Sequence, residues 1–124
     1  MSAVPDLLGF AEEFRAPGQT VIQPERFASA LNLQVQELAQ LAHVHRTTVS
    51  EAPANVRLQS YLRRAVQVLS AALEVANDRD RAIYWYRNVP IAEFGHRTAE
   101  QLVADNKTEA VLSYLDSIGA VSTG

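Results

Sequence analysis

The sequence predicts an all-α fold, in which a helix-turn-helix bundle is joined by a long helix to a small C-terminal helical module. Apolar residues recur three and four positions apart along most of the chain, which is the spacing of one face of a helix. Residues that begin or end helices separate these stretches, among them Pro24, Asn55 and Gly119. The predicted parts are an N-terminal helical arm (1–20), the helix-turn-helix (21–54), a connecting helix (55–77) and the C-terminal module (78–124).

Composition narrows the class of protein. The 124 residues are 48% hydrophobic, which suits one compact domain or two small ones that share a core. The net charge of −3 argues mildly against a nucleic-acid binder. Up to Arg64 six arginines balance six acidic residues, so the acidic character lies in the C-terminal half. There is no cysteine, which excludes disulfides and thiolate chemistry. Neither a signal peptide nor a membrane span is apparent, so a cytoplasmic location is expected.

A short helix is expected within the first twenty residues. Leu7, Ala11 and Phe14 would share one face, and Pro17 and Gly18 would end the helix. The segment is either an arm packed on the body or a dimer contact, and both readings stay open.

Three short helices are predicted next. The first begins at Pro24 and ends at Asn32, and its apolar stripe is Phe27, Ala28 and Leu31. The second covers 35–42, a turn follows at 43–45, and the third covers 46–51. A DNA-reading helix-turn-helix needs such a tight turn and a small residue early in its first helix, here Ala39. Val44 and Val49 would hold the second helix at its angle.

The stretch from Leu31 to Glu51 resembles the Xre (lambda-repressor-like) helix-turn-helix. The matching residues are Leu31, Leu33, Glu37, Leu38, Ala39, Leu41, Val44, Arg46, Thr48, Val49 and Ser50. His43 departs from the turn glycine of the family, so a left-handed conformation there would be strained. His45 departs from the usual Ser or Thr cap, and Pro53 cuts the third helix short.

The resemblance implies DNA contact through the exposed side of the third helix. The candidate residues are Arg46, Thr47, Thr48 and Ser50. The alternative is a helix-turn-helix kept as a scaffold or dimer surface, and the neutral local charge leaves both open. His43 and His45 could in principle ligate a metal, but a third ligand is not evident and the turn reading is preferred, so no metal is expected.

A long helix is predicted from the cap Asn55 to about Ala76, roughly 30 Å in length. Asn77 would break it and Asp78 would cap the next helix. Its apolar stripe is Leu58, Tyr61, Leu62, Ala65, Val68, Leu69, Ala72 and Ala76.

The C-terminal module begins with a helix over about 79–87 and a loop over 91–97. Thr98 and Gln101 form a capping-box pattern before a helix with Leu102 and Val103 in the core. Thr108 is expected to cap the last helix, and Gly119 to terminate it before a small, mobile tail. The inner face of that last helix would be Val111, Leu112, Leu115 and Ile118.

The ordered motifs of this module resemble the toxin-binding domain of the Xre/MbcA/ParS antitoxin family. The matching residues are Ala82, Trp85, Asn88, Pro90, Phe94, Gly95, Arg97, Thr98, Leu102, Val111, Leu112, Leu115, Ile118 and Gly119. Ala99 departs from the proline that the family usually has after its Gly-x-Arg-Thr stretch. The two resemblances together cover roughly 21–124.

The resemblance implies an antitoxin of a bacterial type II toxin-antitoxin system. Such antitoxins bind a RES-type toxin, which attacks NAD by phosphorolysis, hydrolysis or ADP-ribosyl transfer, and they obstruct its NAD pocket in part with their C-terminal segment. They are often homodimers, and many repress their own operon, which makes operator DNA a further candidate partner. The implied toxin-binding residues are Tyr84, Tyr86, Arg97, Gly119, Ala120, Val121, Ser122, Thr123 and Gly124.

Several of these residues also have plainer interpretations. Trp85 suits the core of a small helical module, with Tyr84 or Tyr86 as the exposed neighbour. Thr98 is favoured as a helix cap, and Arg97 could equally orient a toxin or be solvated.

No Ser/His/Asp ordering or Gly-rich phosphate loop appears in the sequence, so no catalytic residue, cofactor or enzyme activity is expected. The alternatives to an antitoxin are a DNA-binding transcriptional regulator whose C-terminal half only dimerises, and an orphan helical interaction module.

Overall fold

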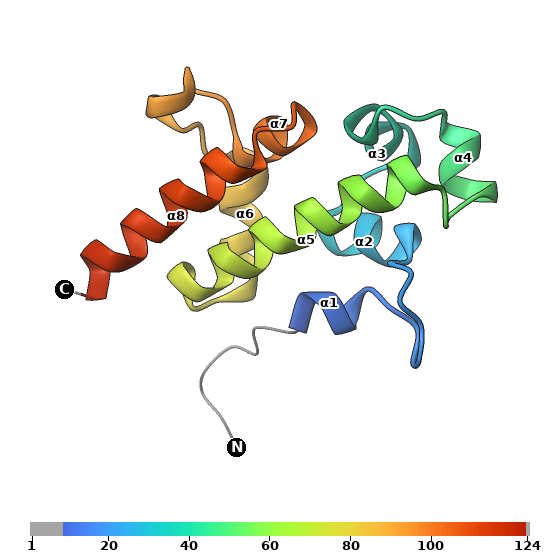
Figure 1. Ribbon diagram of the computed structural model, residues 1–124, viewed down its shortest axis with the longest axis horizontal. Helices are drawn as coiled ribbons and strands as arrows, with labels where there is room; N and C mark the ends of the chain where they lie inside the picture. The colour runs from blue at the N-terminus through green and yellow to red at the C-terminus, as the bar shows by residue number, and fades with distance from the viewer. Residues whose placement is uncertain (1–8, 124) are drawn as a thin grey trace.

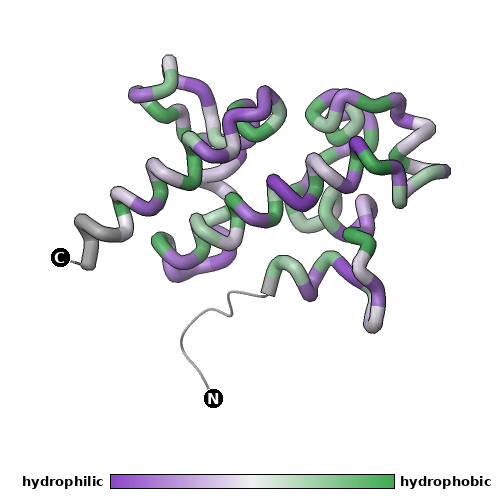
Figure 2. Tube along the Cα trace, viewed as in Figure 1, coloured by the Kyte–Doolittle hydropathy of each residue, from purple (hydrophilic) through white to green (hydrophobic). Residues whose placement is uncertain are grey.

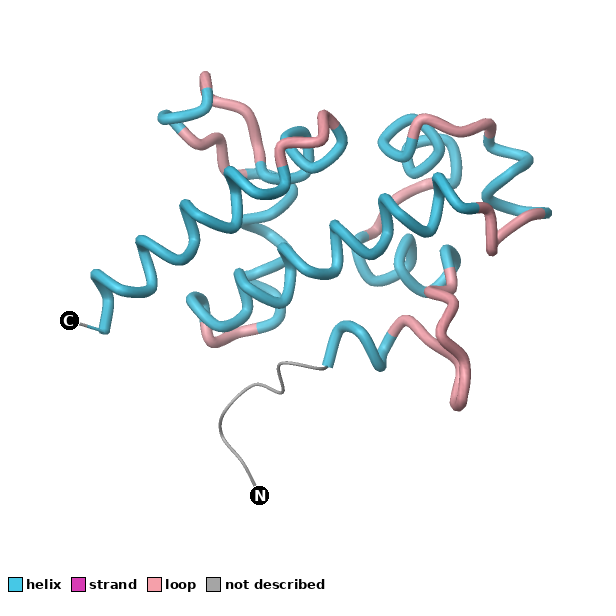
Figure 3. Tube along the Cα trace, viewed as in Figure 1, coloured by secondary structure: helices cyan, strands magenta, loops and turns pink. Residues whose placement is uncertain are grey.

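The computed structural model describes residues 9–123, and within this part the chain is helical with no strand (Figures 1 and 3). The all-α prediction is therefore confirmed. Leu7 and Gly124, on which two sequence expectations fall, lie outside the described residues, and so do the side chains of 120–123. The elements are α1 (Gly9–Glu13), α2 (Pro24–Leu31), α3 (Val35–Ala42), α4 (Arg46–Glu51), α5 (Val56–Ala76), α6 (Arg79–Asn88), the 3-10 turn η1 (Ala92–Phe94), α7 (Ala99–Ala104) and α8 (Thr108–Thr123).

The long helix α5 is the element on which the others pack. In Figure 1 it crosses the middle of the molecule, with α2–α4 towards one end and α6–α8 towards the other. Its predicted stripe is buried except for Ala76, which is only half-buried. Figure 2 shows hydrophobic and hydrophilic positions alternating along both α5 and α8, as expected of helices with one face on the core. The buried residues of both ends form a single hydrophobic cluster.

The predicted caps of three helices are present. The side chain of Asn55 accepts a hydrogen bond from the Leu58 amide at 3.0 Å, and Asp78 accepts one from the Arg81 amide at 2.9 Å. Thr98 accepts from the amide of Gln101 at 3.1 Å. The Gln101 side chain returns a bond to the Thr98 amide at 3.0 Å, which completes the capping box. Each cap satisfies an amide that the first turn of a helix leaves without a partner.

Left-handed residues end three of the helices. Asn32, His43 and Asn77 have φ of 59°, 59° and 58°. Asparagine tolerates this conformation, whereas histidine adopts it less readily. His43 thus adopts the left-handed conformation that the sequence analysis described as strained for a non-glycine residue. Helix α4 begins at Arg46, and the side chain of its N-cap residue His45 makes no capping hydrogen bond, as expected.

Two expectations about α8 are wrong. Gly119 does not end the helix, because α8 continues to Thr123. A Cβ at Gly119 would meet Val75 Cγ2 at 3.8 Å, so this turn still lies against α5, and packing there supports a residue with poor helix propensity. Thr108 does not cap the helix either, since its hydroxyl is buried without a hydrogen-bond partner among the described residues.

No helix between Gly9 and Thr123 combines the length and apolar character required to cross a bilayer.

Gly95 and Gly119 should respond oppositely to replacement by alanine. Gly119→Ala should stabilise the fold by about 0.5–1 kcal/mol, because it removes a glycine from a helix interior with only ordinary contact to Val75. Gly95→Ala should destabilise it by about 1 kcal/mol, because Gly95 has φ of +70°. Urea unfolding measures both. Destabilisation by Gly119→Ala would mean that the helix ends there after all.

Candidate interaction surfaces

The three adjacent aromatic residues of α6 point in different directions. Tyr84 is 63% exposed, Tyr86 is 0% exposed, and Trp85 is partly buried against the core. This follows from the rotation of about 100° per residue in a helix. Tyr84 is therefore the exposed tyrosine that the sequence analysis expected. The expected contact of Tyr86 with a partner is corrected, because this side chain lies wholly inside the protein.

Tyr86 instead faces Tyr61 of α5 inside the core. Burial raises the pKa of both phenols well above their ordinary value. Neither hydroxyl has a hydrogen-bond partner among the described residues, although the two lie close enough to affect each other's pKa. Phe27 of α2 packs edge-on against Tyr61, with ring centroids 6.4 Å apart. The tyrosine pair thus belongs to the core that both ends of the molecule share.

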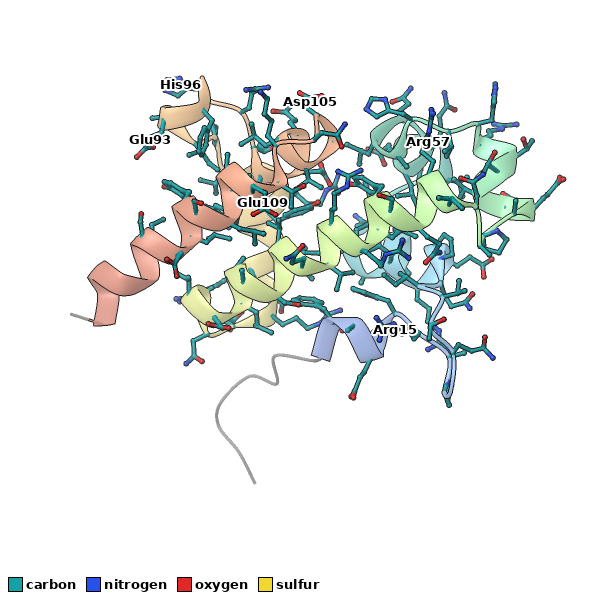
Figure 4. All side chains as sticks on the ribbon, viewed as in Figure 1. Arg15, Arg57, Glu93, His96, Asp105 and Glu109 are labelled. Carbon is teal, nitrogen blue, oxygen red and sulfur yellow. The ribbon has the colours of Figure 1, made fainter. Side chains whose placement is uncertain are left out.

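The loop over 91–97 is a closed turn rather than a free segment. The Ile91 amide donates to the Arg97 carbonyl at 2.9 Å, and the His96 amide donates to the Ile91 carbonyl at 2.9 Å. Gly95 and His96 are both left-handed, with φ of 70° and 63°. Figure 4 shows Glu93 and His96 at the outer end of this loop. The loop therefore projects from the body while its base is fixed.

Arg97 is held at the base of this loop. Its Nε donates to the Phe94 carbonyl at 3.2 Å, and its Nη1 donates to the Asp105 carboxylate at 3.2 Å. The residue is only partly exposed. Arg97 is consequently a positioned guanidinium with limited access, and not a freely solvated one.

The exposed side of α4 carries most of the residues that were expected to read DNA. Arg46, Thr47 and Ser50 are exposed, whereas Thr48 is half-buried and Val49 is 5% exposed and points inward. The small residue Ala39 is 4% exposed and lies in α3, which packs on α4. The helix boundaries agree with the predicted ones, and DNA contact stays a prediction.

The two histidines of the turn before α4 do not point to a metal. The His43 Nε2 lies 2.9 Å from the Ala104 carbonyl oxygen of α7, so this ring is used within the fold. His45 is exposed. Over the residues that the structure describes, no group of three or more His, Asp or Glu side chains could hold a metal ion.

Sequence reasoning missed Arg87, which joins both ends of the molecule. Its Nη1 donates to the Leu31 carbonyl at the end of α2, at 2.8 Å, and its Nε donates to Glu100 of α7 at 2.9 Å. Its Nη2 lies 3.9 Å from the Glu37 carboxylate of α3. Burial raises the pKa of Glu100, against the opposing effect of Arg87, which lowers it. The only signal in the sequence was a basic residue in the last turn of α6, which is too common to identify such a residue.

These contacts border a groove between α3 and α7. Its volume is about 510 Å³, and it contains both acidic and basic side chains. The lining residues that carry charge or titrate are Glu37, His43, Arg87, Arg97, Glu100 and Asp105. Three carboxylates and two guanidinium groups lie together in this lining, and the pairing of opposite charges favours a role in joining helices over a site for one ion.

No protein-family model, curated protein or solved structure matches this chain. The family resemblance therefore rests on the motif residues of the sequence, several of which the structure assigns to caps or to the core. Thr98 caps α7, and Leu102 and Val111 are fully buried.

Removal of the Arg87 guanidinium should make stability more dependent on pH. In Arg87→Met the buried Glu100 carboxylate loses its partner, which should cost roughly 3 kcal/mol near neutral pH. The pKa of Glu100 is already raised on folding, so its contribution to stability is greatest below its unfolded pKa and falls as pH rises through the folded one. The variant raises that pKa further, so its deficit should shrink towards pH 4.5.

Urea unfolding between about pH 4.5 and 7.5 measures this effect. Arg81→Met is the control, because it removes an exposed arginine from the same helix. A constant deficit for Arg87→Met at every pH would contradict the assignment of Glu100 as its buried partner.

Proposed function

We propose that this chain is an antitoxin that neutralises a RES-type, NAD-consuming toxin by covering the NAD pocket of that toxin. The observation that carries the proposal is the end of α8. This helix lies against α5 as far as Gly119, opposite Val75, and α5 itself ends at Ala76. The last turn of α8 extends beyond the other helices drawn in Figure 1. It therefore offers a narrow projection that could enter a cleft in a partner.

The residues of this projection suit steric occlusion. Residues 119–124 read Gly-Ala-Val-Ser-Thr-Gly, and all of these side chains are small and uncharged. Side chains without charge can enter a pocket with little desolvation cost. Because the backbone is already helical to Thr123, binding would sacrifice less conformational entropy than the ordering of a free tail. Inhibition of this kind needs no bond-making, so the proposed role is not enzymatic.

Tyr84 supplies a second proposed contact. It is a large aromatic side chain that is 63% exposed on a helix whose other face is packed. Exposed tyrosines on rigid supports are favoured anchors at protein interfaces. The partly exposed Arg97, held by Asp105, could add a charged contact of fixed orientation. Homodimerisation belongs to this proposal as part of the family resemblance.

The test is whether the adjacent reading frame encodes a RES-type protein, and whether this chain inhibits the NAD consumption of that protein. A truncation that ends at Ile118 should abolish inhibition of NAD consumption, and Tyr84→Ala should weaken toxin binding by about tenfold or more. Val56→Ala is the matched control, because Val56 is 81% exposed but lies on α5. Circular dichroism should show a retained fold for all three variants. Full protection by both the truncation and Tyr84→Ala would contradict the proposal.

A second candidate function is transcriptional repression through α4. The observation that favours it is the shared exposure of Arg46, Thr47 and Ser50, while Val49 anchors the helix to the body. Arg46 makes no ion pair among the described residues, so its charge is free for a phosphate or a base edge.

Arg46→Ala combined with Ser50→Ala should weaken binding to the operator upstream of the gene. The affinity should also depend less on salt: the slope of the log binding constant against log salt concentration should fall by about one, because one arginine is removed. Gel-shift titrations at several salt concentrations measure both effects, with Arg26→Ala as an exposed control on α2. No shift by the intact chain, alone or with the toxin, would remove this candidate.

A further inference from the structure

A second groove lies beside the first half of α5. We call it the α5 groove, and its volume is about 750 Å³. The end of α3, the start of α5 and the turn between α7 and α8 contribute its walls. Its polar lining consists of His43, Asn55, Arg57, Ser60, Arg64 and Asn106. Figure 4 shows Arg57 in this region, on the first turns of α5 next to the helices α3 and α4.

The lining of the α5 groove can donate hydrogen bonds but carries no carboxylate. Every polar side chain in it has an N–H or O–H group, and two of them are arginines. The groove between α3 and α7 has Glu37, Glu100 and Asp105 in its wall, so its arginines are neutralised. The α5 groove is thus a basic site on a chain whose net charge is −3.

Both arginines contact backbone carbonyl oxygens, which do not neutralise their charge; Arg64 is half-buried and Arg57 is exposed. Arg57 Nη1 lies 3.4 Å from the His43 carbonyl oxygen, and Arg64 Nη1 donates to the Val103 carbonyl at 2.7 Å. The Arg64 guanidinium also lies over the ring of Tyr61, 5.9 Å from its centroid. Over the residues that the structure describes, Arg79, Arg87 and Arg97 pair with carboxylates, whereas Arg57 and Arg64 have none within 4.0 Å.

An uncompensated, half-buried guanidinium favours the binding of an anion. Arg64 is partly withdrawn from water, which weakens the hydration of its charge and strengthens its attraction for a negative ligand. A guanidinium that donates one N–H to a carbonyl still has other N–H groups to donate to a second partner. The planar fork of arginine matches the oxygens of a phosphate better than any other side chain does.

We propose that the α5 groove binds phosphate groups through Arg57 and Arg64. The two residues are seven positions apart on one helix, or roughly 10 Å between Cα atoms, so their long side chains can converge on one phosphate or hold two neighbours. A nucleic-acid backbone and the diphosphate of a small nucleotide share this chemistry. The site is separate from Tyr84 and from the end of α8, so it does not rest on the antitoxin proposal.

The experiment titrates the full-length chain with two probes, inorganic pyrophosphate and a DNA duplex of random sequence, while backbone amide NMR signals are followed. The variants are Arg57→Gln and Arg64→Gln. Arg63→Gln is the matched control, because it removes the same charge one position from Arg64 but does not line the groove. Each groove variant should weaken binding by about tenfold, and the control should change it little.

The two probes identify the source of the phosphate. Binding of pyrophosphate that shifts the amides of the groove residues supports the site and assigns it to a small phosphorylated ligand. Binding of the duplex but not of pyrophosphate also supports the site and assigns it to a nucleic-acid backbone. In that case the slope of the log binding constant against log salt concentration should be smaller by about one in each groove variant. Arg64 also contacts Val103 and Tyr61, so its replacement by glutamine removes contacts within the fold as well as the charge. If Arg64→Gln does not fold, Arg64→Lys takes its place, because lysine keeps the charge. Arg64→Lys should bind phosphate more weakly than the wild type, because lysine lacks the planar fork of arginine.

Failure of both probes to bind at low salt would overturn the proposal. It would also be overturned if Arg63→Gln weakened binding as much as the two groove variants do. Neutralisation of the toxin should be unchanged in Arg57→Gln, so a failure here is distinguishable from a failure of the proposed inhibition.

Discussion

The guanidinium of Arg87 sets the position of the two ends of this molecule relative to each other. From α6 it reaches the last carbonyl of α2, the buried carboxylate of Glu100 in α7 and the edge of Glu37 in α3. Hydrogen bonds of this kind are directional, whereas the hydrophobic effect that buries the apolar face of α5 is not. The hydrophobic cluster therefore supplies most of the cohesion, and Arg87 fixes the alignment. The bond from His43 to the Ala104 carbonyl also joins the two ends, and the bond from Arg64 to the Val103 carbonyl joins α5 to α7.

Much of the fold could be predicted because its signals are local. The stripe of α5 and the caps at Asn55, Asp78 and Thr98 each depend on residues a few positions apart. The end of α8 could not be predicted in this way, because Gly119 carries a local stop signal that contact with α5 near Val75 overrides. The hydroxyl of Thr108 similarly turns inward, although the residue type favours capping.

The candidate surfaces were only partly accessible to sequence reasoning. Helical rotation required that Tyr84 and Tyr86 face different ways, but the choice between them depended on Tyr61, which is far away in the sequence. Arg57 and Arg64 could be placed on one face of α5 from their spacing. Arg57 and Arg64 differ from Arg87 and Arg97 because no carboxylate lies close to them among the described residues. This difference arises only when the chain folds, so sequence reasoning could not find it.

Because α8 is unbroken, its length and the directions in which its side chains point are linked. Each residue of an unbroken helix advances it by 1.5 Å and rotates it by 100°. A single residue inserted between the α5 contact and Thr123 would therefore lengthen the projection only slightly but turn its outer side chains by more than a quarter of a circle. For the proposed toxin contact, lineages that vary the length of this segment are expected to keep recognition most readily when they add or remove close to whole turns.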